Sequence, residues 1–416
     1  MPFVSYLRLA YASPRFLGFG FTMTFAASVG QTVFIGTFSP AIRADFDLTH
    51  TGWSAIYMAG TLASAAIFPW TGQQIDRIPL RRYTTWTCLG LVFACAFAAL
   101  VPSAVWLVLA VFLLRQTGQG LASHTAKTAT ARHFHFDRGK ALALTSLGDG
   151  VGKAILPYLA VLSIAAIGWR ATYGVAAAVI AVFLLPLAWR LLKPGGNEGV
   201  DPSDPAERQA RDQAHGSSWS RRQVLRDVRF YLMLPAVLAP AFVSTALFFH
   251  NLQIAAVKGW SAAWMTGSYW IYAGGTVFAS LAVGPLIDRL TAARVLPAFL
   301  LPMVLGLLIV WAFESRYWVW PYLLFVGLTS GISHTAVMSF WAEAYGIRHL
   351  GGIRSLAFSL MVFSTALGPL FMGVLMDWHV PVETICLLMA AYCIAATALM
   401  LVGLNGYKSR AVAPPT

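Results

Sequence analysis

The stretch GQQIDRIPLRR at Gly72–Arg82 returns as GPLIDRLTAAR at Gly284–Arg294, 212 residues later. Each copy has a glycine, an aspartate four positions further on, an arginine directly after it, and more basic residues at its end. Two other short sequences recur in the same order, GWSA from Gly52 and Gly259 and SHTA from Ser123 and Ser333, with offsets of 207 and 210. Three landmarks kept in one register indicate that the chain is a duplicated unit.

The composition is that of a membrane protein. Of the 416 residues, 58% are hydrophobic and 11% are charged, whereas about a quarter of a soluble protein is charged. The apolar residues form blocks of about 20, long enough to cross a ~30 Å hydrocarbon layer as helices. We therefore predict an all-α membrane protein with twelve transmembrane helices in two six-helix bundles. The predicted spans are residues 16–39, 52–74, 83–102, 104–130, 140–164, 169–191, 230–252, 262–287, 294–313, 318–342, 354–376 and 383–404.

Lysine and arginine are distributed unevenly over the loops between these spans. With the N-terminus inside, 22 of the 29 lie on the cytoplasmic side, and four, Arg43, Arg170, Lys258 and Arg316, lie outside. Loops rich in these residues stay in the cytoplasm. We therefore expect a multi-pass protein of the plasma (inner) membrane with both termini in the cytoplasm. The net charge of +13 then reflects topology and contact with anionic membrane lipid, and it is no sign of nucleic-acid binding.

Residues 193–229 interrupt the hydrophobic pattern with glycine, proline and charge, as a linker does. They separate an N-terminal bundle, residues 1–192, from a C-terminal bundle, residues 230–416. Because six helices are an even number, the two copies start on the same side of the membrane and are parallel repeats. Near the end of the linker, Ser220 and Gln223 have the spacing of a helix cap. Apolar residues alternate there with arginines, which predicts an amphipathic helix that lies on lipid or binds a partner.

The repeated stretch has a physical use at the end of a helix. Gly72 and Gly284 would let a neighbouring backbone approach closely. Asp76 and Asp288 can accept hydrogen bonds from the first amides of an adjacent helix and can pair with an arginine, Arg132 being the candidate for Asp76. Such a cluster would tie the two halves together on one face only. We therefore expect it to belong to a gate.

The pattern Gly-x-x-x-Asp-Arg followed by basic residues, between spans two and three and again between spans eight and nine, resembles the signature loop of the major facilitator superfamily. The resemblance covers the whole chain. It implies a transporter that alternates between two conformations, with spans one, four, seven and ten along the central path, and a gating role for the loop. Together with Arg132, the gating candidates are Gly72, Asp76, Arg77, Arg81, Gly284, Asp288 and Arg289.

Four ionised side chains fall inside predicted spans: Arg115 and Lys127 in span four, and Asp149 and Lys153 in span five. A charge near the bilayer centre costs about 2.5–3.5 kcal/mol on insertion scales, so these groups must face water or one another. Arg115, Asp149 and Lys153 carry two positive charges against one negative, which favours an anionic substrate and a carboxylate above all. The alternative is a closed cluster of these three that only joins spans four and five. Lys127 is close enough to the cytoplasmic face to snorkel.

Proton coupling needs a group that titrates. His124 and His334 are repeat mates in spans four and ten, and histidine is the side chain whose charge changes near neutral pH. Asp149 is the third candidate, and both histidines also fit a packing role. Arg115 and Lys153 are expected to bind the substrate. The polar residues expected to complete the pocket are Gln31, Tyr57, Gln119, His250, Asn251, Tyr269 and Tyr272.

The run RGKALALTSLGDGVGKAILPYL at residues 138–159, followed by IGWRATY at 167–173, is similar to monocarboxylate-transporter-like members of the superfamily. That similarity implies a small organic anion as the substrate. Those members carry an Asp and Arg pair in span eight, and residues 271–287 contain no charge, so Asp149 and Lys153 would take its place. The alternative is a proton-coupled exporter of drugs or metabolites. Its span-four motif resembles RQTGQG from Arg115 with the glycines shifted by one position.

Enzyme and receptor classes lack support in the sequence. It contains no His-Glu-x-x-His, Gly-x-Ser-x-Gly or Gly-x-x-x-x-Gly-Lys pattern, so we expect neither catalysis nor a cofactor or metal. Cys88, Cys95, Cys386 and Cys393 lie within spans and are expected to be packed thiols. The expected partners are a small anionic substrate, protons and membrane lipid, and we expect a monomer.

Overall fold

The computed structural model describes residues 2–134, 137–192, 221–345 and 350–408. Most of the predicted linker, residues 193–220, therefore lies outside the described part. The predicted amphipathic helix is represented there by α12 (Arg221–Val224), a single turn, and α13 already begins at Val228. The helix expected near the end of the linker is thus interrupted at residues 225–227, and Val228 and Arg229 already belong to the membrane span α13.

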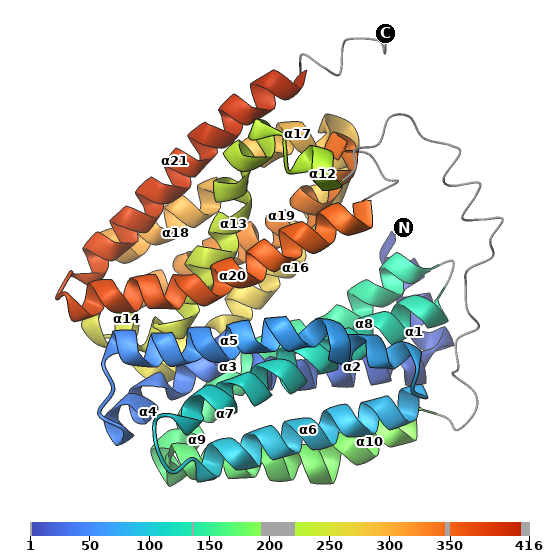
Figure 1. Cartoon of the computed structure of the whole chain (residues 1–416), viewed down its shortest axis with the longest axis vertical. Helices are drawn as coiled ribbons and strands as arrows, with labels where there is room; N and C mark the ends of the chain where they lie inside the picture. The colour runs from blue at the N-terminus through green and yellow to red at the C-terminus, as the bar shows by residue number, and fades with distance from the viewer. Residues whose placement is uncertain (1, 135–136, 193–220, 346–349, 409–416) are drawn as a thin grey trace. The chain divides into compact units, whose positions relative to one another are not determined.

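The first half of the chain is helical along its described length (Figure 1). Each predicted span has a counterpart within a few residues. The elements are α1 (Pro2–Ala12), α2 (Pro14–Ala27), η1 (Ser28–Gly30), α3 (Thr32–Ile35), η2 (Gly36–Phe38), α4 (Ser39–Asp45), α5 (His50–Gly72), η3 (Gln73–Asp76), α6 (Leu80–Leu100), α7 (Trp106–Leu114), η4 (Arg115–Ala122), α8 (Ser123–His133), α9 (Arg138–Val179), η5 (Ile180–Leu184) and α10 (Leu185–Leu191).

The second half continues in the same way. After α12 its elements are α13 (Val228–Phe249), α14 (Asn251–Val257), α15 (Ala262–Gly267), α16 (Tyr269–Leu290), α17 (Ala292–Val295), η6 (Leu296–Ala298), α18 (Leu301–Ala312), η7 (Arg316–Trp318), α19 (Val319–Tyr345), α20 (Leu350–Asp377) and α21 (Val382–Lys408).

Long apolar helices account for most of the predicted crossings. By length and composition, eight helices in the described part could cross a membrane, or nine if α2 to α4 count as one bent span. One of the eight, residues 139–191, holds two crossings, because Gly168 breaks it with φ 81° and ψ 163°. The remaining two predicted spans, α5 and the run from α7 to α8, are long enough but too polar to meet the same test. These two carry Tyr57 and Arg115, so they are polar where the candidate site lies.

The contacts of the chain divide it into two compact units. Unit 1 comprises residues 1–202 together with residues 248–253 and 262–270. Unit 2 comprises residues 203–247, 254–261 and 271–416. The end of α13 and all of α15 therefore pack with the first unit, although the sequence places them in the second bundle. All four cysteines are buried and free, which confirms them as packed thiols.

Small residues let the first and fifth spans pack closely in unit 1. A Cβ atom at Gly148 would lie 2.1 Å from the carbonyl oxygen of Phe21, and one at Gly152 would lie 2.2 Å from Oγ of Ser28. At Gly150, by contrast, a Cβ would meet nothing within 4 Å. The glycines on one face of α9 are thus contact positions, whereas Gly150 faces open space.

We expect Gly148→Ala to lower the free energy of unfolding by about 1–3 kcal/mol, since the added methyl group must push α9 away from α2. Gly150→Ala is the matched control, two residues away in the same helix. It should leave stability unchanged or raise it by up to about 1 kcal/mol, because alanine favours a helix over glycine. Thermal unfolding of the purified variants measures both effects. Equal losses in the two variants would contradict the close packing of α2 and α9.

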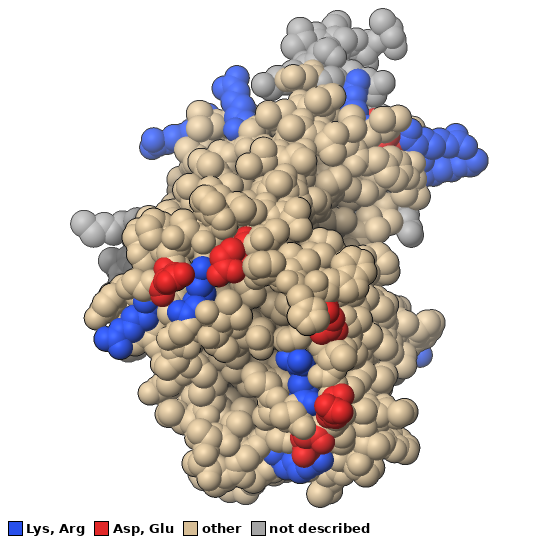
Figure 2. All heavy atoms as spheres, turned by 90° about the vertical axis from the view of Figure 1, so that its left-hand side faces the viewer, with Lys and Arg blue, Asp and Glu red and all other residues tan. Residues whose placement is uncertain are grey.

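An ion pair joins the first and last helices of each half. In unit 1, Asp45 Oδ2 lies 2.7 Å from Arg170 Nη2, and in unit 2, Lys258 Nζ lies 2.8 Å from Glu383 Oε1. Asp45 and Lys258 are 213 residues apart, and so are Arg170 and Glu383. The two pairs thus occupy equivalent positions of the repeat with their charges exchanged. Figure 2 shows acidic and basic side chains lying next to one another at several places on the surface.

Breaking the two ion pairs should have unequal effects. The Lys258 side chain is 3% exposed, whereas those of Asp45 and Arg170 are 41% and 40% exposed. Glu383→Gln leaves a buried ammonium without its carboxylate and should lower the free energy of unfolding by about 2–3 kcal/mol. Asp45→Asn breaks a solvated pair and should cost under about 1 kcal/mol. A denaturation series compares them, and a larger effect of Asp45→Asn would refute this ranking.

Candidate functional site

The first membrane span is broken at Gln31. The backbone there is extended, with φ −91° and ψ 156°, and the helices on either side meet at 46°. The α2–η1 segment ends at Gly30 and α3 begins at Thr32. The break places two consecutive polar side chains, a half-buried Gln31 and a buried Thr32, in the middle of an otherwise apolar span. Interrupted spans of this kind are where transporters form binding sites.

The fourth span is irregular at the same level. Residues Arg115–Ala122 form the π-helical segment η4, and such segments occur often at functional sites. A Cβ atom at Gly118 would lie 2.7 Å from the Cα of Gly30, so only glycines allow this contact between η1 and η4. The contact brings the break in span one directly against the π-helical turn and places Arg115 beside Thr32.

Arg115 is buried among neutral groups. Its residue is 5% exposed, and its Nη1 donates to Oε1 of Gln119 and lies 3.5 Å from Oγ1 of Thr32. The guanidinium carbon lies 5.5 Å from the centre of the Tyr57 ring, and the Tyr57 hydroxyl is 2.5 Å from Thr32 Oγ1. Among the described residues, no carboxylate lies within ion-pairing distance of Arg115. A buried cation with only neutral partners is suited to binding an anion.

Asp149 forms a second polar group next to the first. Its Oδ2 lies 2.8 Å from Nζ of Lys153, one turn further along α9, and its Oδ1 accepts from Nε2 of Gln31. Ser28 Oγ also donates to the Asp149 carbonyl at 3.4 Å. The side chains of Asp149 and Lys153 are 30% and 21% exposed, so the pair is partly accessible at the surface of the protein. Gln31 therefore links span five to the break in span one.

The single cluster of Arg115, Asp149 and Lys153 considered from the sequence does not form. Arg115 contacts Thr32, Tyr57 and Gln119. Asp149 and Lys153 pair with each other. Among the described contacts, the neighbouring residues Gln31 and Thr32 link the two groups. The prediction missed this separation because spacing along a helix does not show which neighbouring helix each side chain faces.

The candidates from span seven onward make contacts with other residues. Asn251 Nδ2 donates to the Tyr269 hydroxyl at 3.0 Å, and His250 Nε2 is 3.3 Å from Ser54 Oγ, all within unit 1. The Tyr272 hydroxyl donates to Ser330 at 3.3 Å within unit 2. None of these contacts involves Arg115, so among the described contacts only Gln31, Tyr57 and Gln119 join the charged residues as expected.

The two repeat-mate histidines have different surroundings. His124 Nε2 is 3.2 Å from the Gly72 carbonyl oxygen and its Nδ1 is 3.4 Å from Thr128, so it packs against the end of α5. His334 is exposed. The described contacts of His124 do not include Asp149. His124 thus lies beside the repeated Gly-x-x-x-Asp-Arg stretch and away from the Asp149 and Lys153 pair.

The repeated stretch forms the expected ion pair, but the pair does not join the parts of the protein that were predicted. Arg132 Nη2 binds Oδ1 of Asp76, and its Nη1 donates to the Ile75 carbonyl at 3.4 Å. Both partners belong to unit 1, so the pair joins α8 to η3 inside one bundle and does not tie the two halves together. Arg77 is exposed, whereas the Arg81 guanidinium lies 4.6 Å from the Trp189 ring centre.

The close backbone approach predicted at the two signature glycines is wrong. A Cβ atom at Gly284 would meet nothing within 4 Å, and one at Gly72 would make only ordinary contacts, the nearest to the Phe68 ring at 3.4 Å. Neither position is needed for close approach of a neighbouring backbone. In unit 2 Arg289 is exposed, and the Asp288 side chain lies outside the described part. The exposed Glu343, near the end of α19, accepts from the Ala292 amide at the start of α17 at 2.8 Å.

Two features escaped the sequence analysis. The π-helical turn has no composition signal of its own, although RQTGQG is polar for a membrane span. Arg43 and His50 meet His250 in a small pocket, and only the neighbouring GWSA landmark hinted that this loop mattered. Both features depend on contacts between helices that are far apart in the sequence.

The repeated spans and the polar groups buried inside the first bundle are those of a multi-pass membrane transporter. Residues 20–369 match the family profile of the Major Facilitator Superfamily, and the chain belongs to this family. The family identifies it as a transporter rather than an enzyme.

Solved transporters share the fold. The bacterial homologue of the human lysosomal transporter Spinster, in an inward-facing and unoccupied conformation, is similar with a TM-score of 0.73 and 13% identity, over 97% of this chain and 99% of that one. Its inward-facing and occupied form has a TM-score of 0.68, 14% identity, and coverage of 99% and 97%. A point mutant of the nucleoside transporter NupG has a TM-score of 0.71 and 10% identity, over 93% and 99%. None of the curated protein sequences compared with the chain matches it.

Proposed function

We propose that this transporter moves a small organic anion of the monocarboxylate type by alternating access, coupled to protons. The observation that carries the proposal is the burial of Arg115, 5% exposed, among neutral partners only. A guanidinium in such a place is stabilised by a carboxylate that binds to two of its N–H groups at once. Substrate and arginine would then complete each other's charge.

The neutral side chains around Arg115 fit this role. Thr32 and Tyr57 share a hydrogen bond, so their hydroxyls can reorient to donate to a bound carboxylate. Gln119 accepts from the guanidinium and would give up this bond to the substrate. Residues His250, Asn251, Tyr269 and Tyr272 remain candidates for the rest of the substrate pathway.

The pair of Asp149 and Lys153 is the proposed coupling site. The two side chains lie 2.8 Å apart, are partly exposed, and are joined to the break in span one through Gln31. Protonation of Asp149 would release both Lys153 and Gln31, and Gln31 is the neighbour of Thr32 in the substrate group. A proton at one group therefore has a direct route to affect the other. His124 and His334 are the alternative proton carriers.

The proposed gate is the Asp76 and Arg132 pair, with Gly72, Arg77, Arg81 and the second-copy residues Gly284, Asp288 and Arg289. In keeping with the arginine-rich loops, we place both termini in the cytoplasm and the protein in the plasma (inner) membrane, as a monomer. The proposed domain division remains residues 1–192, 193–229 and 230–416.

Uptake into proteoliposomes tests the substrate class. With an imposed pH gradient, radiolabelled lactate or acetate should accumulate above the level in liposomes without protein. Accumulation that collapses with a protonophore supports proton coupling. Efflux of a hydrophobic cation dye with no carboxylate flux would instead favour the drug-exporter alternative and overturn the anion proposal.

A further inference from the structure

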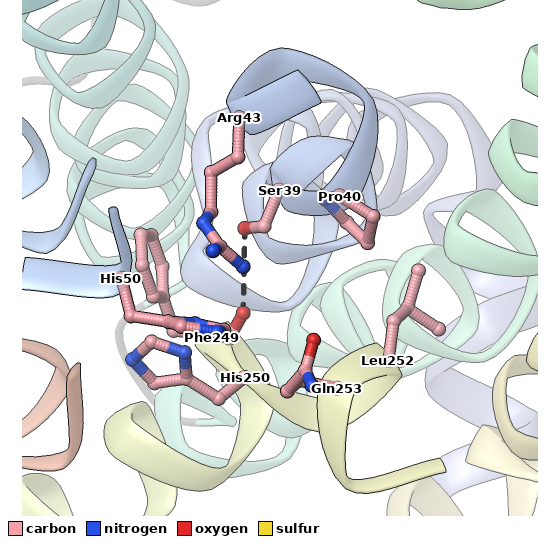
Figure 3. A pocket seen from close by; sticks show the side chains of 8 residues that line it. All are labelled: Ser39, Pro40, Arg43, His50, Phe249, His250, Leu252 and Gln253. Carbon is pink, nitrogen blue, oxygen red and sulfur yellow. Dashed lines mark hydrogen bonds between the residues drawn. The ribbon is translucent and has the colours of Figure 1, made fainter. Parts of the chain in front are cut away.

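A small pocket opens at the end of unit 1 that carries the α4–α5 turn (Figure 3). The space between its lining atoms is about 220 Å³, a volume that includes open solvent at its mouth. Arg43 and Ser39 from α4, His50 from α5, and Phe249, His250 and Gln253 from the α13–α14 connection contribute to its lining. None of these residues has a described contact with Arg115 itself, but the Phe249 ring packs on that of Tyr57 with ring centres 4.6 Å apart. The pocket therefore adjoins the Arg115 group, and its own charged side chains, Arg43, His50 and His250, do not belong to that group.

The ionisable side chains of the pocket are Arg43, which is positively charged, and His50 and His250, which become positively charged when they are protonated. Arg43 Nε donates to the Leu48 carbonyl at 3.1 Å, which anchors the side chain, and its guanidinium points into the pocket. The His50 and His250 rings lie with their centres 5.7 Å apart. No carboxylate is among the lining side chains. Two acidic residues lie nearby in the sequence. Asp45, the last residue of α4, pairs with Arg170, and Asp47, on the turn after α4, is exposed.

The neutral residues in and around the pocket make hydrogen bonds and ring contacts that hold its lining in place. Ser39 Oγ donates to the Phe249 carbonyl at 3.4 Å, and Ser54 Oγ lies 3.3 Å from Nε2 of His250. The Phe249 ring stacks on Trp53 with ring centres 5.7 Å apart. These contacts fix the α13–α14 connection on α4 and α5, so that the two histidines and Arg43 face one space.

We propose that this pocket is a second anion site, which binds a small carboxylate together with protons taken up by His50 and His250. Two imidazolium rings this close to each other and to an arginine repel, and a carboxylate between them removes the repulsion. Binding of the anion and protonation of the histidines must then favour each other by the same factor. The inference deepens the proposed function and rests on it for the anion class, but not on Arg115.

The test is calorimetric titration of the purified full-length protein with acetate at about pH 5.5 and about pH 7.5, the range over which histidine changes charge. We expect wild-type affinity at this site to be about tenfold higher at the lower pH, with net proton uptake, a coupling of ordinary size. In the double variant His50→Gln/His250→Gln, the ratio of the acetate affinities at the two pH values should fall below about threefold. Arg43→Gln should weaken acetate binding at this site at both pH values. A titration with inorganic phosphate in place of acetate shows whether any small anion binds.

Arg115→Gln and Ser54→Ala are the matched controls. Arg115→Gln should remove acetate binding at the first site and leave the pH-dependent site intact, while Ser54→Ala removes a hydrogen bond of His250 without removing a charge and should keep the pH dependence. An unchanged pH ratio in the histidine variant overturns the proposal. So does binding to the wild-type protein without proton uptake, a measurement that needs no variant. If instead the histidine effect holds and Arg115→Gln transports normally, this pocket stands and the proposed substrate site fails.

Discussion

Uptake of a small carboxylate is expected to fall by about 100-fold or more in Arg115→Gln, since about 3 kcal/mol of charge-assisted hydrogen bonding is lost. Glutamine is polar and still reaches toward Gln119 and Thr32, so the local packing is largely kept. The substitution removes the only charge from the group that Arg115 forms with Thr32, Tyr57 and Gln119. Initial rates of uptake into proteoliposomes, together with acetate-induced thermal stabilisation, measure the loss.

Arg115→Lys is the control that keeps the positive charge but removes the planar guanidinium group. An ammonium keeps the positive charge but cannot present two parallel N–H groups, so about tenfold weaker transport is expected. Because Arg115 has no described carboxylate partner, its loss should not destabilise the unliganded protein. Wild-type uptake by Arg115→Gln would show that the residue only packs spans one, two and four.

Asp149→Asn is expected to abolish accumulation driven by a proton gradient while exchange of substrate across the membrane continues. Asparagine can still accept from Gln31, but it neither takes up a proton nor neutralises Lys153. The transporter would then cycle without coupling. Counterflow of labelled substrate, measured beside gradient-driven uptake, separates the two activities.

The same substitution should lower the free energy of unfolding by about 1–2 kcal/mol, less than for a fully buried pair because both side chains are partly exposed. The double variant Asp149→Asn/Lys153→Met removes both charges and should regain most of that stability. Asp149→Glu keeps a titrating group and should retain coupling in part. Normal accumulation by Asp149→Asn would move the coupling role to another residue, His124 first.

The sequence predicted several parts of the molecule because they follow from composition and repetition. Apolar blocks of about 20 residues have to become helices in lipid, which gave the spans within a few residues. The cost of a charge in a span singled out Arg115, Asp149 and Lys153. The aspartate of the repeated stretch suggested its pairing with Arg132, which the structure contains.

Other parts could not be predicted from the same patterns. The partner of Arg115 depends on the break at Gln31 and on the π-helical turn, which change the direction of side chains without changing the hydrophobic pattern. Gly284 faces open space although its spacing matches that of a contact residue. The equivalence of the Asp45 and Lys258 ion pairs was hidden because the repeat exchanges their charges.

The sequence by itself therefore determined that this chain crosses the membrane as two copies of a six-helix unit and that it carries ionised groups where lipid forbids them. The tertiary structure decided which of those groups are neutralised inside the protein and which are not. Asp149 meets Lys153 because both lie on one helix, a distance that the sequence fixes. Arg115 is left among neutral side chains because a kinked span and a π-helical turn meet at Gly30 and Gly118, and contact between distant helices is a property of packing alone.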